Sequence, residues 1–348
     1  MATPDPFEKL SSGASKISKH EFIIAGILCN VFGLDELAKD TRPVTCLWLL
    51  HPRLSNSERM TPIASAAITA WNSQPNRQRG LIAVSFDQRN HGTRKQNDRA
   101  NEAWRGGNPL HAQDMFSVYH GTAMDCSHLI SYIHAYAFPE NDHDVTDNIA
   151  LGVSLGGHAT WQCVLHDPRI SAGVSIIGCT DYVRMMSQRA MKSKLDTWHK
   201  SSTPGENFLG SKDFPKGLLT IVDKTDPSAL LMNEMLPRGC TLQEAQRAPT
   251  EAEIKKLWPL MRQHIAGKRI FNLSGGADKL VPYSCSEPFL AWLKNAIKPG
   301  GWYADQGVVL KDQIYDGVGH EMTAQMMNDA VQFVVETLKV EKEIVAKI

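Results

Sequence analysis

Short, unbroken apolar runs recur along the chain, and they constrain its fold more than any other feature. Each run has the length of a β-strand and is followed, after a turn, by a stretch with helical spacing. The runs lie at 44–50 (VTCLWLL), 81–86 (LIAVSF), 148–153 (NIALGV), 173–178 (GVSIIG) and 269–273 (RIFNL), and a last segment of strand length, 308–314 (VVLKDQI), is apolar at its two ends. Continuously apolar strands are typical of a parallel sheet that is covered on both faces. We therefore predict an α/β fold with a mostly parallel central sheet and helices on both faces.

The stretches between these runs carry the stripes of amphipathic helices. From Met115 to Ala137, apolar residues recur in steps of four and three, which places them on one helix face. Two further stripes run over 289–297 and 322–338. The apolar segment 22–34 is too short to cross a bilayer, so we interpret it as one or two early strands.

The segment 181–268 interrupts this alternation of strands and helices. It contains helical patches and several prolines but no clear strand. A structureless loop of such length is improbable in a compact domain. We predict that 181–268 is a helical cap inserted into a single domain that spans 1–348.

Charge and composition exclude several classes of partner. Lys+Arg and Asp+Glu both total 37, so the formal net charge is zero. No overall field would then draw the protein to nucleic acid or to an anionic membrane. We expect no nucleic-acid partner and no membrane span, and the sequence predicts no particular oligomeric state.

The cysteines indicate a reducing compartment. The seven residues are an odd number, are widely scattered, and include no pair with the spacing of a zinc or redox site. We therefore predict buried free thiols and a cytoplasmic protein. The terminal residues 346–348 (AKI) are weakly similar to a peroxisomal address, although a frayed helix end is the favoured interpretation.

The sharpest chemical signal is GVSLGG at 152–157, which follows the run at 148–153 and precedes a helical stretch. In this context Ser154 lies on a tight, strained turn between strand and helix, so the residues two places before and after it must be small. The turn exposes the hydroxyl above the strand ends, and the N-terminus of the helix favours negative charge there. The alternative is a glycine-rich structural turn. We predict that Ser154 is a nucleophile.

A serine nucleophile needs a base, and the base needs a carboxylate to orient it. Asp278 lies in SGGAD, directly after the run at 269–273, and His320 ends GVGH, directly after the run at 308–314. Taken singly, Asp278 could be a turn residue and His320 a helix cap. Their placement after late strands, in the order Ser154, Asp278, His320, predicts a catalytic triad.

At these residues the chain resembles the α/β-hydrolase superfamily, from about residue 23 to residue 338. The segment DQRNHG at 87–92 also looks like the D-x-R-G-H-G segment of that superfamily. The pattern is similar to lidded esterase-like and dienelactone-hydrolase-like members, including fungal ones. The doubled glycine after Ser154 is also similar to prolyl-oligopeptidase-like peptidases and acetyl esterases.

The resemblance implies an oxyanion hole made by two backbone N–H groups. One would belong to Leu155, and the other would come from the loop after the run at 44–50. Pro52 in that loop has no N–H, so Arg53 is the candidate and Leu54 the second choice.

These observations predict a serine hydrolase, with carboxylic ester hydrolysis favoured. A serine at this position favours ester, thioester, lactone or peptide substrates, and the chemistry requires no metal or organic cofactor. A peptidase or an acyltransferase could use the same triad. The alternative from another class is a ligand-binding protein that keeps the fold with slow turnover or none, because fold alone never establishes activity.

Overall fold

The structure, a computed structural model, describes residues 5–8 and 16–340. The terminal residues 346–348, on which the peroxisomal interpretation depends, lie outside this range. At the centre is an eight-stranded sheet with the order β1-β2-β4-β3-β5-β6-β7-β8. The strands are β1 (Lys19–Ile24), β2 (Ile27–Phe32), β3 (Pro43–Leu50), β4 (Gly80–Phe86), β5 (Asp144–Val153), β6 (Ile170–Ile176), β7 (Arg269–Gly275) and β8 (Val309–Tyr315). β2 is antiparallel to β1 and β4, and all other neighbouring pairs are parallel.

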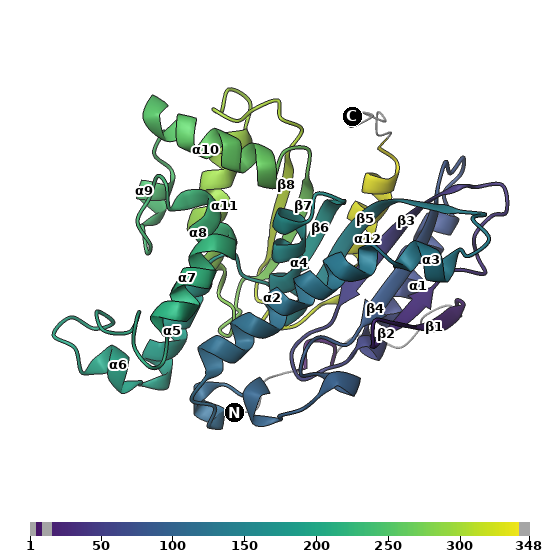
Figure 1. Ribbon diagram of the computed structural model, residues 1–348. Helices are drawn as coiled ribbons and strands as arrows, with labels where there is room; N and C mark the ends of the chain where they lie inside the picture. The colour runs from purple at the N-terminus through teal and green to yellow at the C-terminus, as the bar shows by residue number, and fades with distance from the viewer. Residues whose placement is uncertain (1–4, 9–15, 341–348) are drawn as a thin grey trace.

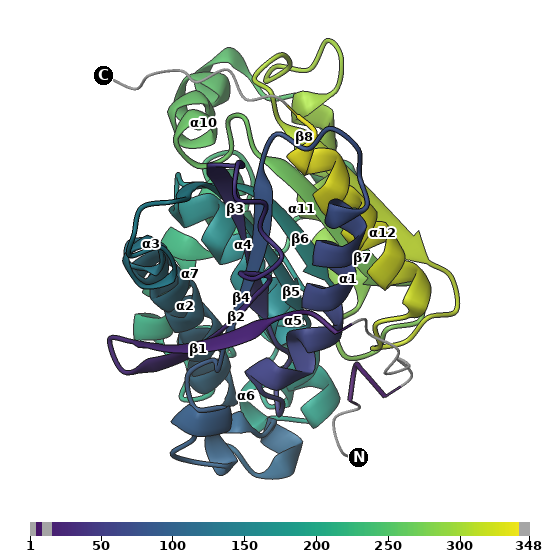
Figure 2. The same cartoon turned by 90° about the vertical axis from the view of Figure 1, so that its right-hand side faces the viewer.

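Helices cover both faces of this sheet, as the sequence predicts. α1 (Thr61–Asn72) and α12 (Ala324–Leu338) lie on one side, while α2 (His111–Ile130) and α4 (Leu155–His166) lie on the other (Figure 2). The remaining helices outside the segment 181–268 are α3 (Ile133–Ala137), α11 (Tyr283–Ile297) and the short 3-10 helices η1 (Ser57–Met60), η2 (Gly92–Arg94), η3 (Arg99–Asn101) and η4 (Trp104–Gly106).

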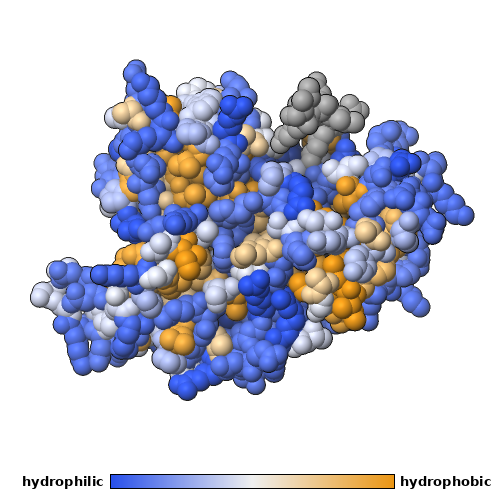
Figure 3. Space-filling view, viewed as in Figure 1, coloured by the Kyte–Doolittle hydropathy of each residue, from blue (hydrophilic) through white to orange (hydrophobic). Residues whose placement is uncertain are grey.

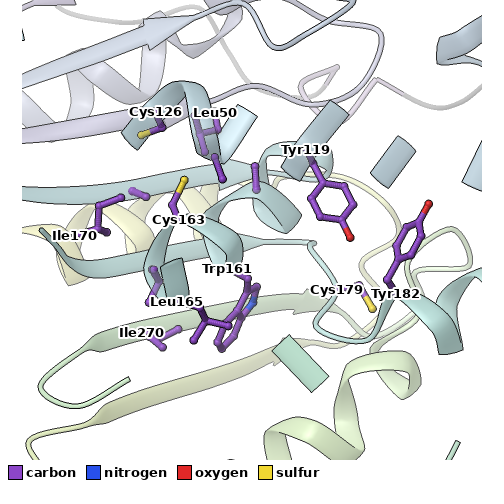
Figure 4. Packing of buried hydrophobic residues seen from close by; sticks show 14 of the residues in the cluster. Leu50, Tyr119, Cys126, Trp161, Cys163, Leu165, Ile170, Cys179, Tyr182 and Ile270 are labelled. Atoms are coloured by element: carbon purple, nitrogen blue, oxygen red, sulfur yellow. The ribbon is translucent and has the colours of Figure 1, made fainter. Parts of the chain in front are cut away.

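The two faces have separate cores because side chains alternate along each strand. In β3, Trp48 and Leu50 pack with the α2 and α4 side, whereas Leu47 and Leu49 pack with the α1 and α12 side. All four side chains are fully buried, which explains why the strand is continuously apolar in sequence. Figure 4 shows part of the first core, where Trp161 of α4 packs near Ile270 of β7.

One local prediction is confirmed, and another needs adjustment. The segment 22–34 forms parts of two strands, β1 and β2, joined by a turn in which Ala25 and Gly26 both have positive φ. The stripe that begins at Met115 is divided between α2 and α3, because the first helix ends at Ile130 and the second starts at Ile133. The apolar periodicity continues through this break, so periodicity alone cannot locate it.

The segment 181–268, which we call the cap segment, contains helices and no strand among its residues, all of which are described. Its helices are α5 (Tyr182–Ser193), α6 (Asp196–His199), α7 (Lys216–Thr225), α8 (Pro227–Met232), α9 (Leu242–Ala245) and α10 (Glu251–His264). They lie together beside the end of the sheet that carries β8 (Figure 1). The surface over this segment has hydrophobic patches within a mainly hydrophilic face (Figure 3), and its exposed large apolar residues are Met191, Ile221 and Trp258.

No helix within the described residues combines the length and the apolar character that a membrane crossing requires.

Candidate active site

Ser154 occupies a strained turn between β5 and α4. Its φ of 56° and ψ of −111° lie in a region that non-glycine residues rarely adopt. A Cβ on Gly152 would overlap the carbonyl oxygen of Gly156, and a Cβ on Gly156 would overlap that of Leu50. Both collisions are with backbone, which cannot move aside cheaply. The spacing of glycines around Ser154 is therefore a direct requirement of this turn.

The structure brings Ser154, His320 and Asp278 into one chain of hydrogen bonds. Ser154 Oγ lies 2.8 Å from His320 Nε2, and His320 Nδ1 lies 2.7 Å from Asp278 Oδ2. An ionised carboxylate can only accept hydrogen bonds, so the proton on Nδ1 points to Asp278 and Nε2 is left to accept from the serine hydroxyl. All three side chains are buried.

Backbone hydrogen bonds fix the position of the acid. Asp278 Oδ1 accepts from the N–H groups of Leu280 at 2.8 Å and Val281 at 2.9 Å, so the carboxylate cannot rotate freely. The loop that follows β7 is also joined to the loop that follows β8, since the Ala277 N–H donates to the Val318 carbonyl at 2.8 Å. The two loops thereby hold Asp278 and His320 side by side although they are far apart in sequence.

The loop after β3, which contains the predicted oxyanion donor Arg53, lies against this turn. His51 is fully buried, and its Nδ1 lies 2.7 Å from the Pro52 carbonyl while its Nε2 accepts from the Gln88 N–H at 2.9 Å. Burial, followed by the neighbouring His91, lowers the pKa of His51 to about 4. His51 is therefore a neutral residue that orients the loop, and Leu54 completes the turn with a φ of 61°.

The segment 87–92 holds the neighbouring loops in place. Asp87 accepts hydrogen bonds from the backbone of Ser57 at 2.8 Å and of Thr93 at 2.7 Å. His91 Nδ1 lies 2.9 Å from the Arg89 carbonyl, and its ring packs edge-on against His51. These contacts position the loops beside the site, and His91 has no hydrogen bond to Ser154 or His320.

Two residues near the triad belong to no recognisable sequence motif. His158, on the helix after Ser154, is buried and accepts from the Cys179 N–H at 2.9 Å. Burial lowers its pKa to about 3. Arg189 of α5 reaches the acid loop, where its Nη2 lies 3.2 Å from the Leu280 carbonyl. Sequence patterns do not single out Arg189, because nothing in the pattern of α5 distinguishes this arginine from its neighbours.

Within the described ranges, no three His, Cys, Asp or Glu side chains are grouped so that they could hold a metal ion.

The order of these groups along the sheet decides which fold this is. The serine follows β5, the acid follows β7 and the histidine follows β8, on a sheet that is parallel from β4 to β8. The chain has the α/β-hydrolase fold. No protein-family model matches the chain, and no curated protein matches it in sequence.

Solved structures are similar to this chain at low sequence identity. TT1662 from Thermus thermophilus is 15% identical, with a TM-score of 0.56 over 94% of this chain and 100% of that one. An acylaminoacyl peptidase from Pyrococcus horikoshii is 12% identical, with a TM-score of 0.46 over 96% of this chain and 41% of that one. SOBER1 from Arabidopsis thaliana is 14% identical, with a TM-score of 0.40 over 85% of this chain and 100% of that one. At 15% identity the likeness to TT1662 bears on the fold alone and not on the substrate.

Proposed function

We propose that this protein is a serine hydrolase, and that its substrates are carboxylic esters, thioesters or lactones. The observation that carries the proposal is the hydrogen-bonded chain from Ser154 through His320 to Asp278. Such a chain lets a weak nucleophile react, because the base removes its proton as it attacks.

In this mechanism Ser154 Oγ attacks the substrate carbonyl while His320 Nε2 takes the hydroxyl proton. Asp278 holds the imidazole in the required tautomer and stabilises the imidazolium that forms. His320 then gives the proton to the leaving alcohol, and an acyl group stays on Ser154. A water molecule, activated by the same histidine, hydrolyses this acyl-enzyme. The steps require no metal and no organic cofactor.

We assign the oxyanion hole to the backbone N–H groups of Leu155 and Arg53. Leu155 begins α4, so its N–H belongs to the positive end of a helix. The loop that contains Arg53 meets the turn at Ser154, where Leu50 and Gly156 leave no space for a side chain between them. Loss of one oxyanion donor costs on the order of 10²–10³ in rate in other hydrolases.

We further propose that the cap segment covers this site within a single domain and sets the substrate range. Its buried apolar side chains, which include Phe208, Phe214 and Leu218, support a mostly apolar acyl pocket. We place the protein in the cytoplasm, since all seven cysteines are buried free thiols and such thiols persist in reducing compartments.

Turnover of p-nitrophenyl esters of graded chain length tests the proposal. Wild type should hydrolyse at least one of them, and Ser154→Ala and His320→Ala should each lose more than about 10³-fold in kcat. Ser117→Ala removes a hydroxyl from the exposed side of α2 and is the matched control. Full turnover by folded Ser154→Ala would refute the assignment. A folded wild type that binds esters without releasing product would favour the ligand-binding alternative.

A further inference from the structure

Arg189 brings a positive charge beside the triad, and no carboxylate within the described residues forms an ion pair with it. Its guanidinium contacts three neutral groups, namely His111 Nε2 at 3.3 Å, Met115 Sδ at 3.0 Å and the Leu280 carbonyl at 3.2 Å. Its Nε–H is buried and has no hydrogen-bond partner. No Asp or Glu of the described chain lies within 4.0 Å of this guanidinium.

His111 cannot supply the missing negative charge. Its Nδ1 lies 3.0 Å from the Glu102 carbonyl and donates to it, which leaves Nε2 as the acceptor that faces Arg189. Burial, followed by the charges of Arg189 and Arg53, lowers the pKa of His111 well below its ordinary value. The histidine is therefore neutral, and it holds the guanidinium in place without neutralising it.

Two other partly buried arginines make ion pairs, whereas Arg189 makes none within the described residues. On the same helix, Arg184 Nε lies 3.2 Å from Asp181 Oδ2. Arg94 of the loop after β4 lies 2.8 Å from Asp125 Oδ2. A charge that is buried without a counter-charge is strongly unfavourable. The Asp278 carboxylate acts on Arg189 only from a distance and is hydrogen-bonded to His320, so the guanidinium keeps donors for a negative group that arrives with a ligand.

The position of Arg189 indicates where such a negative group would bind. The Leu280 carbonyl that it contacts belongs to the residue whose N–H binds Asp278. One helical turn further along α5, the ammonium group of Lys192 donates to the carbonyl of Lys279, the residue next to Asp278, at 3.1 Å. Neither lysine has an ion pair within the described residues. Arg189 and Lys192 therefore place two cationic groups on the loop that holds Asp278.

We propose that the substrate carries a carboxylate in addition to its ester group, and that Arg189 binds that carboxylate and determines specificity. A planar guanidinium pairs well with a planar carboxylate, and its buried Nε–H provides a donor that no protein group uses. The inference rests on the proposed function, because it names the substrate class of the same site.

Matched pairs of esters test this inference. One pair is phenyl pentanoate and phenyl hydrogen glutarate, which differ by a carboxylate on the acyl side. The other is phenyl butyrate and 4-(butyryloxy)benzoate, which differ by a carboxylate on the alcohol side. Wild type should prefer the anionic member of at least one pair by about 10–100-fold in kcat/KM, the range of a charge-assisted hydrogen bond. Arg189→Met should bring that ratio close to one, and Arg189→Lys should restore part of it.

The matched control is Arg184→Gln, which changes a paired arginine on the same helix and should leave the ratio at its wild-type value. A wild-type ratio near one in both pairs, or a ratio unchanged in Arg189→Met, would overturn the inference even if both rates fall.

A direct binding measurement separates this failure from failure of the proposed function. Glutarate should raise the Tm of Ser154→Ala but not of the double variant Ser154→Ala, Arg189→Met. If no ester is hydrolysed, that comparison of Tm values still decides whether Arg189 binds a carboxylate, and equal shifts in the two proteins would overturn the inference.

Discussion

The turn at Ser154 and the cap segment are built by different kinds of contact. Around Ser154, backbone meets backbone so closely that Gly152 and Gly156 have no space for a side chain. In the cap segment, a methyl group added at Gly217 or Gly239 would meet no atom within 4 Å. The cap helices are held instead by side-chain contacts, such as the Tyr182 hydroxyl on the Ala112 carbonyl. The first region therefore tolerates few residue types, whereas the second accepts many, and this difference decides which residues a sequence pattern can reveal.

The largest contrast should appear between two buried aspartates. In Asp278→Asn the amide oxygen would still accept hydrogen bonds from the N–H groups of Leu280 and Val281. The NH2 group of the asparagine would then face His320. An NH2 donor forces the proton from Nδ1 to Nε2, the wrong tautomer for a base, and kcat should fall by about 10⁴-fold. Steady-state ester hydrolysis measures this change.

Asp226, in the cap segment, provides the comparison. Burial, followed by the nearby Asp181, raises the pKa of its carboxyl group well above the ordinary value, so asparagine closely imitates the protonated form. Asp226→Asn should show no comparable loss of kcat. Equal losses in Asp226→Asn and Asp278→Asn would contradict the special role of Asp278.

A second contrast compares a glycine from each region by the free energy of unfolding. Gly156→Ala places a methyl group against the Leu50 carbonyl and should cost about 1–3 kcal/mol or more. Gly217→Ala, on the exposed first turn of α7, should instead stabilise the protein by about 0.4–1 kcal/mol, because it restricts the unfolded chain. Chemical denaturation checks both values, and a harmless Gly156→Ala would show that the turn is looser than its backbone contacts indicate.

A third prediction concerns His158, which follows the turn on α4. Its pKa is about 3 in the folded protein because of burial, against an ordinary value of 6.5. Below pH 6.5 the unfolded chain binds a proton that the folded protein does not, so the free energy of unfolding falls as the pH falls. Between pH 7 and pH 5 this single group should account for about 2 kcal/mol.

His158→Asn tests this assignment, since its side-chain oxygen can accept from the Cys179 N–H in place of Nδ1. The variant should be less stable at pH 7 and should lose less stability than wild type on acidification to pH 5. Denaturant titrations at the two pH values measure the difference. Identical pH dependence in both proteins would mean that His158 protonates without unfolding.

The same contrast explains how much could be predicted from the sequence. The parallel sheet was predictable because strands such as β3 are buried on both faces and are continuously apolar. The glycines around Ser154 were recognisable because backbone contacts dictate them. The α/β-hydrolase fold and its helices on both faces are confirmed, while the catalytic roles of Ser154, Asp278 and His320 stay a prediction that their geometry supports.

Other features could not be predicted from the sequence. The break between α2 and α3 lies within an uninterrupted apolar stripe. Arg189 is notable because no carboxylate within the described residues forms an ion pair with it. Only the packing of α5 against α2 and the acid loop shows this. Burial of His51 and His158, which lowers the pKa of each, likewise depends on tertiary contacts.

Intact-mass analysis after treatment with a fluorophosphonate is the most direct test that Ser154 is an activated nucleophile, because this probe reacts with such a serine whatever the natural substrate is. We expect one adduct on wild type, located at Ser154 by peptide mapping, and none on Ser154→Ala. No adduct on folded wild type, or an adduct that persists in Ser154→Ala, would contradict the assignment of the triad.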